Sequence, residues 1–173
     1  MSRSGAVTFK GAPMTLAGQA VDAGQPAPDF TTHYFEGGMQ TLTLADLKGK
    51  PTLISVVPSL DTGVCATQTK KFNDQLGELG DKVHAVTISA DLPFAMNRFC
   101  GAESIKNLRV ASDYQDRSFG KAYGTLIEEL KIECRAVFVL AADGKVTYAQ
   151  YVDEVTDEPD YETAIAELKK LAG

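Results

Sequence analysis

Two short runs rich in β-branched residues, in the middle of the chain, constrain its fold more than any other feature. Thr52–Val57 and Val83–Ile88 show no polar alternation, which is typical of strands covered on both faces of a sheet. The segment between them, Gly63–Leu79, carries a helical pattern of apolar residues. A strand, a helix and a second buried strand in this order predict an α/β fold, in which helices pack against a central sheet.

The rest of the chain continues this alternation. Further predicted elements are two short helices, two strands joined by an Asp143-Gly144 turn, and a last amphipathic helix: 94–99, 117–123, Ala136–Leu140, Val146–Val152 and 161–171. Near the start, Gly11–Pro13 separates two short strand-like runs, which predicts a β-hairpin over about residues 7–17. We therefore expect a mixed sheet flanked by helices on both faces. This order is compatible with a thioredoxin-like fold, although periodicity does not select it.

Length and charge exclude several classes of protein. At 173 residues, with no linker or repeat, the chain is expected to form one domain over residues 1–173. Its 17 Lys and Arg against 23 Asp and Glu give a net charge of −6 without a basic block, so a phosphate backbone is not an expected partner. No apolar run approaches the roughly 20 residues of a membrane span. Because Gly5, Gly11 and Pro13 interrupt the first 16 residues, no secretory signal is expected either, and we expect a cytoplasmic protein.

The number and spacing of the cysteines narrow the chemistry. Three cysteines are too few, and odd in number, for a disulfide-stapled domain. They lie at positions 65, 100 and 134, so no pair has the C-x-x-C spacing of a zinc site or a thioredoxin-type redox motif. In a reducing compartment, any disulfide between them is expected to be transient and catalytic.

Cys65 is the strongest candidate for a reactive thiol. It follows the strand Thr52–Val57 and a turn-like segment, which places it in the first turn of the predicted helix. Free backbone N–H groups and the helix dipole stabilise a thiolate there, and Thr62 is a candidate N-cap whose hydroxyl could bond an N–H near Cys65. Cys65, Phe72 and Leu76 share one stripe of the helix, so a buried cysteine acting as a small hydrophobe is the alternative.

The other two cysteines have weaker local signals. Cys100 is expected at the end of a helix, with Gly101 as its C′ residue and Arg98 nearby. Cys134 precedes Arg135 at the entry to a strand, where a structural role is favoured and the two side chains are expected to point to opposite faces.

Several strings in the sequence resemble one protein family. Pro58-Ser-Leu-Asp-Thr-Gly-Val-Cys65 matches the P-x-x-x-T/S-x-x-C signature of peroxiredoxins, and with the preceding Val57 it resembles their bacterial thiol peroxidase subfamily. Further pieces similar to that subfamily occur along nearly the whole chain: Ala27–Phe30, Ser89–Ala95, Arg98–Ala102, Arg135 before its strand, and Val152–Tyr161.

The resemblance implies a two-cysteine peroxidase on a thioredoxin-like fold. Cys65 matches the peroxidatic cysteine, and Cys100 matches the resolving cysteine of the same chain. Thr62 and Arg135 match the residues that hold the peroxide and activate the thiolate, and Pro58 matches the residue that shields the pocket. The substrates implied are hydrogen peroxide and organic hydroperoxides. The family also implies antioxidant defence, a homodimer, reduction by thioredoxin, and no metal or organic cofactor.

Two consequences follow from these assignments. A disulfide needs Cα atoms within about 7 Å, and Cys65 and Cys100 are expected on different helices, so a bond between them requires one helix to unwind in part. We expect this rearrangement around residues 92–101, because Pro93 and Gly101 are helix-stop residues. Cys134 is not needed by the family mechanism and is expected to be a bystander. The alternatives are a non-enzymatic redox sensor that uses the same two cysteines, and an inert domain with three buried thiols.

Overall fold

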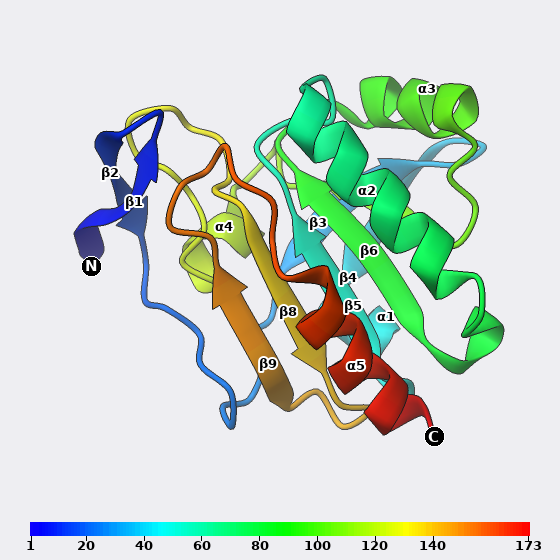
Figure 1. The fold of residues 1–173 in the computed structure, drawn as a ribbon. Helices are drawn as coiled ribbons and strands as arrows, with labels where there is room; N and C mark the ends of the chain where they lie inside the picture. Colours follow the sequence, from blue (N-terminus) through cyan, green and yellow to red (C-terminus); the bar gives the residue numbers. More distant parts are fainter.

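A seven-stranded mixed sheet forms the centre of the computed structural model, which describes residues 1–173 (Figure 1). Its strands are β3 (Thr31–Phe35), β4 (Met39–Thr43), β5 (Thr52–Val56), β6 (His84–Ser89), β7 (Arg109–Ser112), β8 (Ala136–Leu140) and β9 (Val146–Tyr151). They lie in the order β4-β3-β7-β6-β5-β8-β9. Strands β5, β6 and β7 are parallel, whereas the other neighbouring pairs are antiparallel. The predicted mixed sheet is therefore confirmed.

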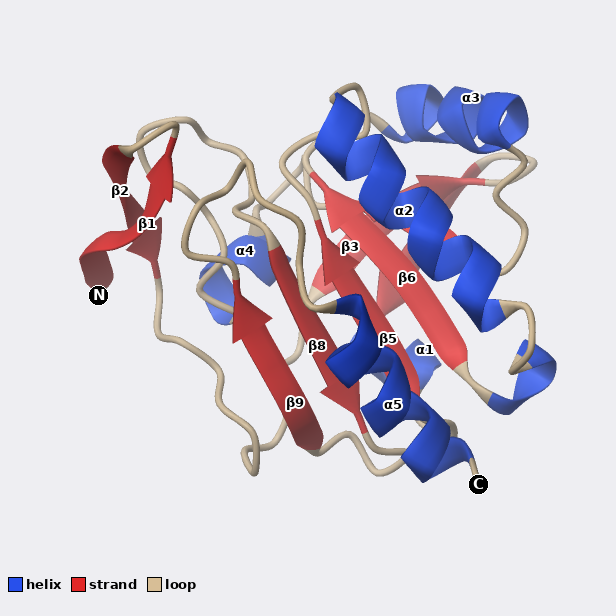
Figure 2. Cartoon of the chain, in the orientation of Figure 1, coloured by secondary structure: helices blue, strands red, loops and turns tan.

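Helices cover both faces of this sheet (Figure 2). They are α1 (Leu44–Leu47), α2 (Gly63–Leu76), α3 (Pro93–Glu103), α4 (Ser118–Ala122) and α5 (Tyr161–Ala172), together with a 3₁₀ turn at Gly80–Lys82. One face carries α2, α3 and α5, and the other carries α1 and α4. None of these helices combines the length and apolar character needed to cross a membrane.

Strand β5 shows why its sequence has no polar alternation. All five of its residues are buried, and successive side chains point to opposite faces of the sheet. Leu53 packs in the cluster that includes Phe72 of α2, whereas Ile54 packs in the cluster that includes Phe119 of α4. Because apolar layers lie on both sides, a continuous run suits the strand better than alternation does.

The N-terminal hairpin is confirmed and is longer than predicted. Strands β1 (Ser2–Phe9) and β2 (Ala12–Ala17) pair in antiparallel fashion. The end of β1 also pairs with the segment that follows β9, because the Thr8 N–H donates to Asp153 O at 2.7 Å and the Val155 N–H donates to Thr8 O at 2.8 Å. The hairpin thereby fixes the loop that contains Val155.

The predicted end of the helix around Cys100 was wrong. Gly101 lies inside α3, which continues to Glu103. The chain reverses at Ser104, which adopts the left-handed conformation with φ 56° and whose N–H donates to Cys100 O. Ser104 therefore takes the left-handed C-cap role that glycine more often has. Cys100 consequently lies one turn before the end of a regular helix rather than at its end.

Candidate active site

The loop between β5 and α2 delivers Cys65 to the first turn of a helix. Residues 57–62 connect the buried strand to α2, and Cys65 is the third residue of that helix. Its side chain is fully buried, in a small apolar cluster that contains Val57 and Leu60 of the loop and Met96 of α3. The sulfur thus lies near a helix N-terminus, where the local field favours an anion, and is screened from bulk water.

Arg135 holds the only cationic group that hydrogen-bonds this sulfur. It directly precedes β8 and is 2% exposed. Its Nη2 donates to Cys65 Sγ at 3.4 Å, its Nη1 donates to Gln68 Oε1 at 2.8 Å, and its Nε donates to Val155 O at 2.9 Å. The guanidinium is almost fully buried and donates to no carboxylate. A thiolate at Cys65 would supply the negative charge that a buried cation requires.

Gln68 is a site residue that sequence reasoning missed. It is fully buried on α2, one turn after Cys65, and its Nε2 donates to Ser55 Oγ of β5 at 2.7 Å. Its amide therefore connects the sheet to Arg135 and helps to fix the orientation in which the guanidinium reaches the sulfur. A signal was present in the sequence, because a glutamine on the buried stripe of an amphipathic helix must find polar partners.

The carbonyl of Val155 completes the support of Arg135. The hairpin holds this segment through Thr8, as described above, and through the Glu154 carboxylate. That carboxylate accepts bonds from the N–H groups of Lys10 and Gly11 at 2.9 and 3.0 Å. The Gly11 bond, together with bonds from Thr156 and Thr8, keeps the pKa of Glu154 far below its usual range. The hairpin turn, the loop and the guanidinium therefore form one connected unit.

Thr62 and Pro58 lie in the loop that precedes Cys65. Thr62 is the N-cap residue of α2, as predicted, with φ −119° and ψ 150°. The predicted capping bond is wrong: the Thr62 hydroxyl donates to Ser59 O at 3.1 Å instead, since an Oγ that bonds the loop behind it does not face the helix N–H groups. Thr62 is exposed, whereas Pro58 is buried. The structure thus places the hydroxyl at the outer rim and the proline ring inside.

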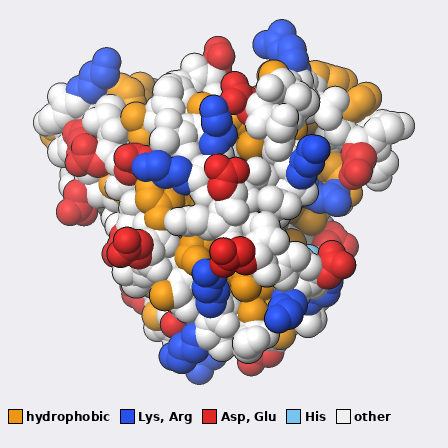
Figure 3. All heavy atoms as spheres, turned by 45° about the vertical axis from the view of Figure 1, so that its right-hand side comes forward, with side chains coloured by type: hydrophobic (Ala, Val, Ile, Leu, Met, Phe, Trp, Pro, Cys, Tyr) orange, Lys and Arg blue, Asp and Glu red, His pale blue; other side chains and the backbone are white.

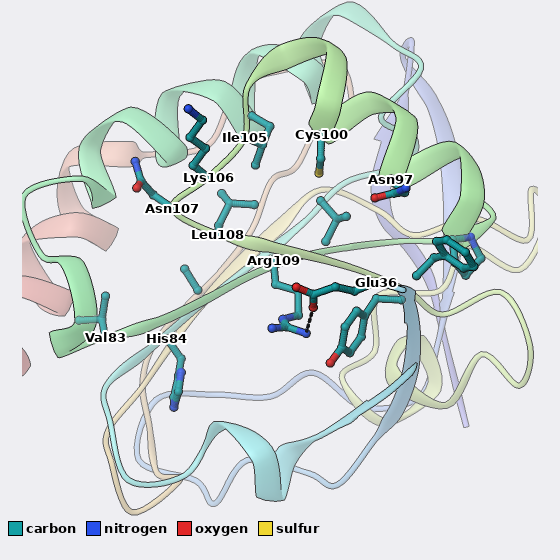
Figure 4. A pocket seen from close by; sticks show the side chains of 15 residues that line it. Glu36, Val83, His84, Asn97, Cys100, Ile105, Lys106, Asn107, Leu108 and Arg109 are labelled. Carbon is teal, nitrogen blue, oxygen red and sulfur yellow. Dashed lines mark hydrogen bonds and ion pairs between the residues drawn. The ribbon is translucent and has the colours of Figure 1, made fainter. Parts of the chain in front are cut away.

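Cys100 lies on α3 and is half-buried. It packs against the same apolar cluster that contains Cys65, and its sulfur points into a cavity of about 430 Å³ between α3 and the sheet (Figure 4). Burial raises the pKa of Cys100 to about 11, so the thiol is protonated in this arrangement. The two candidate cysteines are free thiols on neighbouring elements.

Cys134 faces away from this site. It is fully buried in the cluster on the α4 side of the sheet, whereas the adjacent Arg135 reaches Cys65 on the other side. The prediction that these neighbours point to opposite faces is confirmed. Burial raises the pKa of Cys134 far above its ordinary value, which describes an unreactive core thiol. Groups of three or more His, Cys, Asp or Glu side chains that could hold a metal ion do not occur.

Comparison with known proteins agrees with the chemistry of this site. Residues 22–165 match the Redoxin family. The chain is 52% identical to a thiol peroxidase of Bacillus subtilis over 165 residues, which cover 95% of this chain and 97% of the relative. It is 46% identical to a thiol peroxidase of Streptococcus sanguinis, with 95% and 99% covered.

A solved structure agrees with the fold as well. A peroxiredoxin-like protein from Aquifex aeolicus superposes with a TM-score of 0.87 at 38% identity, and the match covers 98% of this chain and 97% of that one. The chain therefore belongs to the redoxin family and, within it, to the thiol peroxidases, which are oxidoreductases that act on peroxides.

Proposed function

We propose that this chain reduces hydrogen peroxide and organic hydroperoxides by a two-cysteine cycle, in which Cys65 is oxidised by the peroxide and Cys100 of the same chain resolves it. The observation that carries the proposal is the hydrogen bond from Arg135 Nη2 to Cys65 Sγ at 3.4 Å. A buried cation without a carboxylate partner, placed at a cysteine in the first turn of a helix, stabilises a thiolate. The thiolate is the nucleophilic form of the side chain.

In the first step, the Cys65 thiolate attacks the terminal oxygen of the peroxide. An S–O bond forms, the O–O bond breaks, and the departing alkoxide or hydroxide takes a proton and leaves as alcohol or water. Cys65 remains as a sulfenic acid. Arg135 and the first N–H groups of α2 lie where they stabilise the charge that develops on the leaving oxygen. The family resemblance gives Thr62 the role of aligning the peroxide, for which its hydroxyl must exchange its bond to Ser59 O for one to the substrate. The buried ring of Pro58 excludes water.

In the second step, the Cys100 thiol condenses with the sulfenic acid. The new S–S bond forms, and the sulfenic oxygen leaves as water. Cys65 is fully buried and Cys100 lies on another helix, so part of α3 must unwind. Unwinding also returns Cys100 to water, which removes the burial that raises its pKa to about 11 and makes its thiolate accessible. Cys134 takes no part in the cycle.

The remaining assignments rest on the family resemblance. Thioredoxin is the proposed reductant of the disulfide, and the protein is proposed to be a homodimer that needs no metal or organic cofactor. The proposed location in the cytoplasm rests instead on the absence of a visible secretory signal. The proposal of a single domain over residues 1–173 rests on the length of the chain and the lack of a linker or repeat. A non-enzymatic redox sensor is the competing function, and it differs in turnover: a sensor oxidises once, whereas a peroxidase consumes many equivalents when a reductant is present.

Peroxide consumption with thioredoxin and its reductase, measured for Cys65→Ser and Cys100→Ser, tests the proposal. Cys65→Ser should abolish activity. Cys100→Ser should undergo one oxidation per chain and then stop, because its sulfenic acid has no resolving partner. Cys134→Ser is the matched control and should retain wild-type turnover. Activity in Cys65→Ser, or a wild type that oxidises only once, would refute the proposed cycle.

A further inference from the structure

One carboxylate joins the loop before Cys65 to the start of the helix that carries Cys100. Asp91 directly precedes Leu92, the N-cap residue of α3. Its Oδ1 accepts a hydrogen bond from Ser59 Oγ at 2.7 Å, and its Oδ2 accepts one from the Leu60 N–H at 2.8 Å. Both donors belong to the 57–62 loop. Asp91 therefore joins the loop before Cys65 to the start of the helix that must unwind before the cysteines can react with each other.

Asp91 is also anchored to the sheet. Ser89 Oγ, at the end of β6, donates to Asp91 Oδ2 at 2.6 Å, and Ser112 Oγ, at the end of β7, donates to the Asp91 carbonyl. The carboxylate thus accepts three hydrogen bonds from two elements. Charge-assisted bonds of this kind are among the stronger ones in proteins, so this set of contacts, which we call the Asp91 latch, is a firm attachment.

The far end of α3 is attached to α2. Asn73 Oδ1 accepts from the N–H groups of Lys106 and Asn107, both at 2.9 Å, and Lys70 pairs with Glu103 at 2.8 Å. Charges of both signs are interspersed over the face that carries these helices (Figure 3). An exposed ion pair such as Lys70–Glu103 contributes little to the stability of this attachment. The start of α3, by contrast, is connected to the loop before Cys65 by the side-chain hydrogen bonds of the Asp91 latch alone.

We propose that Asp91 is a positioning residue that holds the site in its peroxide-reactive arrangement and delays the unwinding of α3, an inference that rests on the proposed two-cysteine cycle. While the latch is closed, Ser59 and Leu60 are fixed, and the loop that carries Pro58 and Thr62 stays in place around Cys65. The same bonds oppose the departure of α3. Peroxide oxidation therefore benefits from the latch, and disulfide formation is slowed by it.

This arrangement predicts how the sulfenic acid partitions. At Cys65 it either condenses with Cys100, releasing water, or reacts with a second peroxide, which transfers one oxygen and leaves as water or alcohol to give a sulfinic acid. The longer α3 stays packed, the more sulfinic acid forms. Removal of the latch should therefore slow the first oxidation, accelerate the disulfide step and protect Cys65 from over-oxidation.

Rapid-quench mass spectrometry of the full chain separates these steps. The reduced protein is mixed with hydrogen peroxide and quenched with an alkylating agent and dimedone, and the thiol, sulfenic, disulfide and sulfinic forms are quantified over time. The variants are Asp91→Ala and the milder Ser59→Ala, which removes one donor of the latch. Asp46→Ala is the matched control, because Asp46 also accepts one backbone and one hydroxyl bond, both from Thr43, at the start of α1.

For Asp91→Ala we expect disulfide formation to accelerate about tenfold, equivalent to about 1.4 kcal/mol, together with slower thiol loss and less sulfinic acid at high peroxide. Ser59→Ala should shift all three quantities in the same direction by a smaller factor, and Asp46→Ala should match the wild type. Unchanged or slower disulfide formation in both latch variants would overturn the role of Asp91. A wild type that forms no Cys65–Cys100 disulfide would instead overturn the proposed function.

Discussion

Arg135 Nη2 donates a hydrogen bond to Cys65 Sγ at 3.4 Å, across a site in which neither residue is more than 2% exposed. The two lie 70 positions apart in the chain and are brought together because α2 and the entry to β8 meet on one face of the sheet. The Arg135 guanidinium is oriented by Gln68 and Val155 rather than by a carboxylate. Its charge therefore remains available to the sulfur and to the peroxide that reacts with it.

Arg135→Lys tests whether this oriented fork, and not only a positive charge, is required. A lysine ammonium is a point charge and cannot reproduce the three contacts of the guanidinium. We expect the rate of Cys65 oxidation, measured by rapid quench, to fall at least about a hundredfold, as when a donor is removed from other charge-stabilising sites. Arg109→Lys, at an exposed arginine paired with Glu36, should leave the rate unchanged. Equal rates in the two variants would contradict the assignment.

Gln68→Leu tests the bridge between the sheet and Arg135. The change leaves Arg135 Nη1 and Ser55 Oγ without their buried partner, so the free energy of unfolding, measured by urea denaturation, should fall by about 1–3 kcal/mol. Cys65 oxidation should slow as well, because the guanidinium loses one of the contacts that fix its orientation. Thr67→Ala, an exposed neighbour on the same helix, is the control and should change neither quantity. A slower oxidation without loss of stability would argue against a bridge.

The buried carboxyl group of Glu133 should make the free energy of unfolding depend on pH. Full burial, with the nearby charge of Asp113, raises the pKa of Glu133 to about 8. The folded chain therefore keeps a proton that the unfolded chain loses above its ordinary value of 4.5. This contribution to stability is complete below pH 4.5 and is lost as pH rises toward 8, by up to about 1.4 kcal/mol per pH unit.

Glu133→Gln isolates this proton, because the amide stays neutral and still accepts the hydrogen bond from the Thr125 hydroxyl. Urea denaturation between pH 5 and 8 should give a flatter profile than that of the wild type, with the variant the more stable of the two at pH 8. Parallel profiles would show that Glu133 is ionised in the folded protein.

Amide exchange measures the rearrangement of α3 directly. In the reduced protein, the amides of residues 96–101 should be protected, because they lie inside a regular helix whose two ends are tied to the loop before Cys65 and to α2. After oxidation with one equivalent of peroxide, protection there should fall by at least about tenfold, while α5 should remain unchanged as an internal reference. Matching protection in the two states would contradict the unwinding of α3.

The elements that the sequence predicted are those with enough residues to show a pattern. Strand β5 and helix α2 were found because a buried run and an amphipathic stripe repeat over several residues. Strand β7 is four residues long, which is too short for an alternation of polar and apolar residues to be recognised. The edge pair β3 and β4 contains many partly exposed polar residues, so no clear alternation marked it as two strands.

Part of the site, likewise, could be predicted from the sequence and part could not. The helix position of Cys65 followed from local sequence, whereas its partnership with Arg135 was implied only by the family resemblance, since local patterns do not report contacts across 70 positions. The contact between Arg135 and the Val155 carbonyl could not be predicted from residue types, because every residue has a backbone carbonyl. The two hydrogen bonds that Asp91 accepts from the 57–62 loop depend on how β5 and β6 end beside each other, which only the folded chain shows.

Peptide mapping after one equivalent of hydrogen peroxide identifies which cysteines the chain joins in its catalytic disulfide. The wild-type chain is oxidised, alkylated without reduction, digested and analysed by mass spectrometry. We expect one dominant cross-link, Cys65 to Cys100 within a single chain, with Cys134 recovered as a free thiol. A dominant cross-link that contains Cys134, or oxidation that leaves Cys65 as a free thiol, would contradict the proposed cycle.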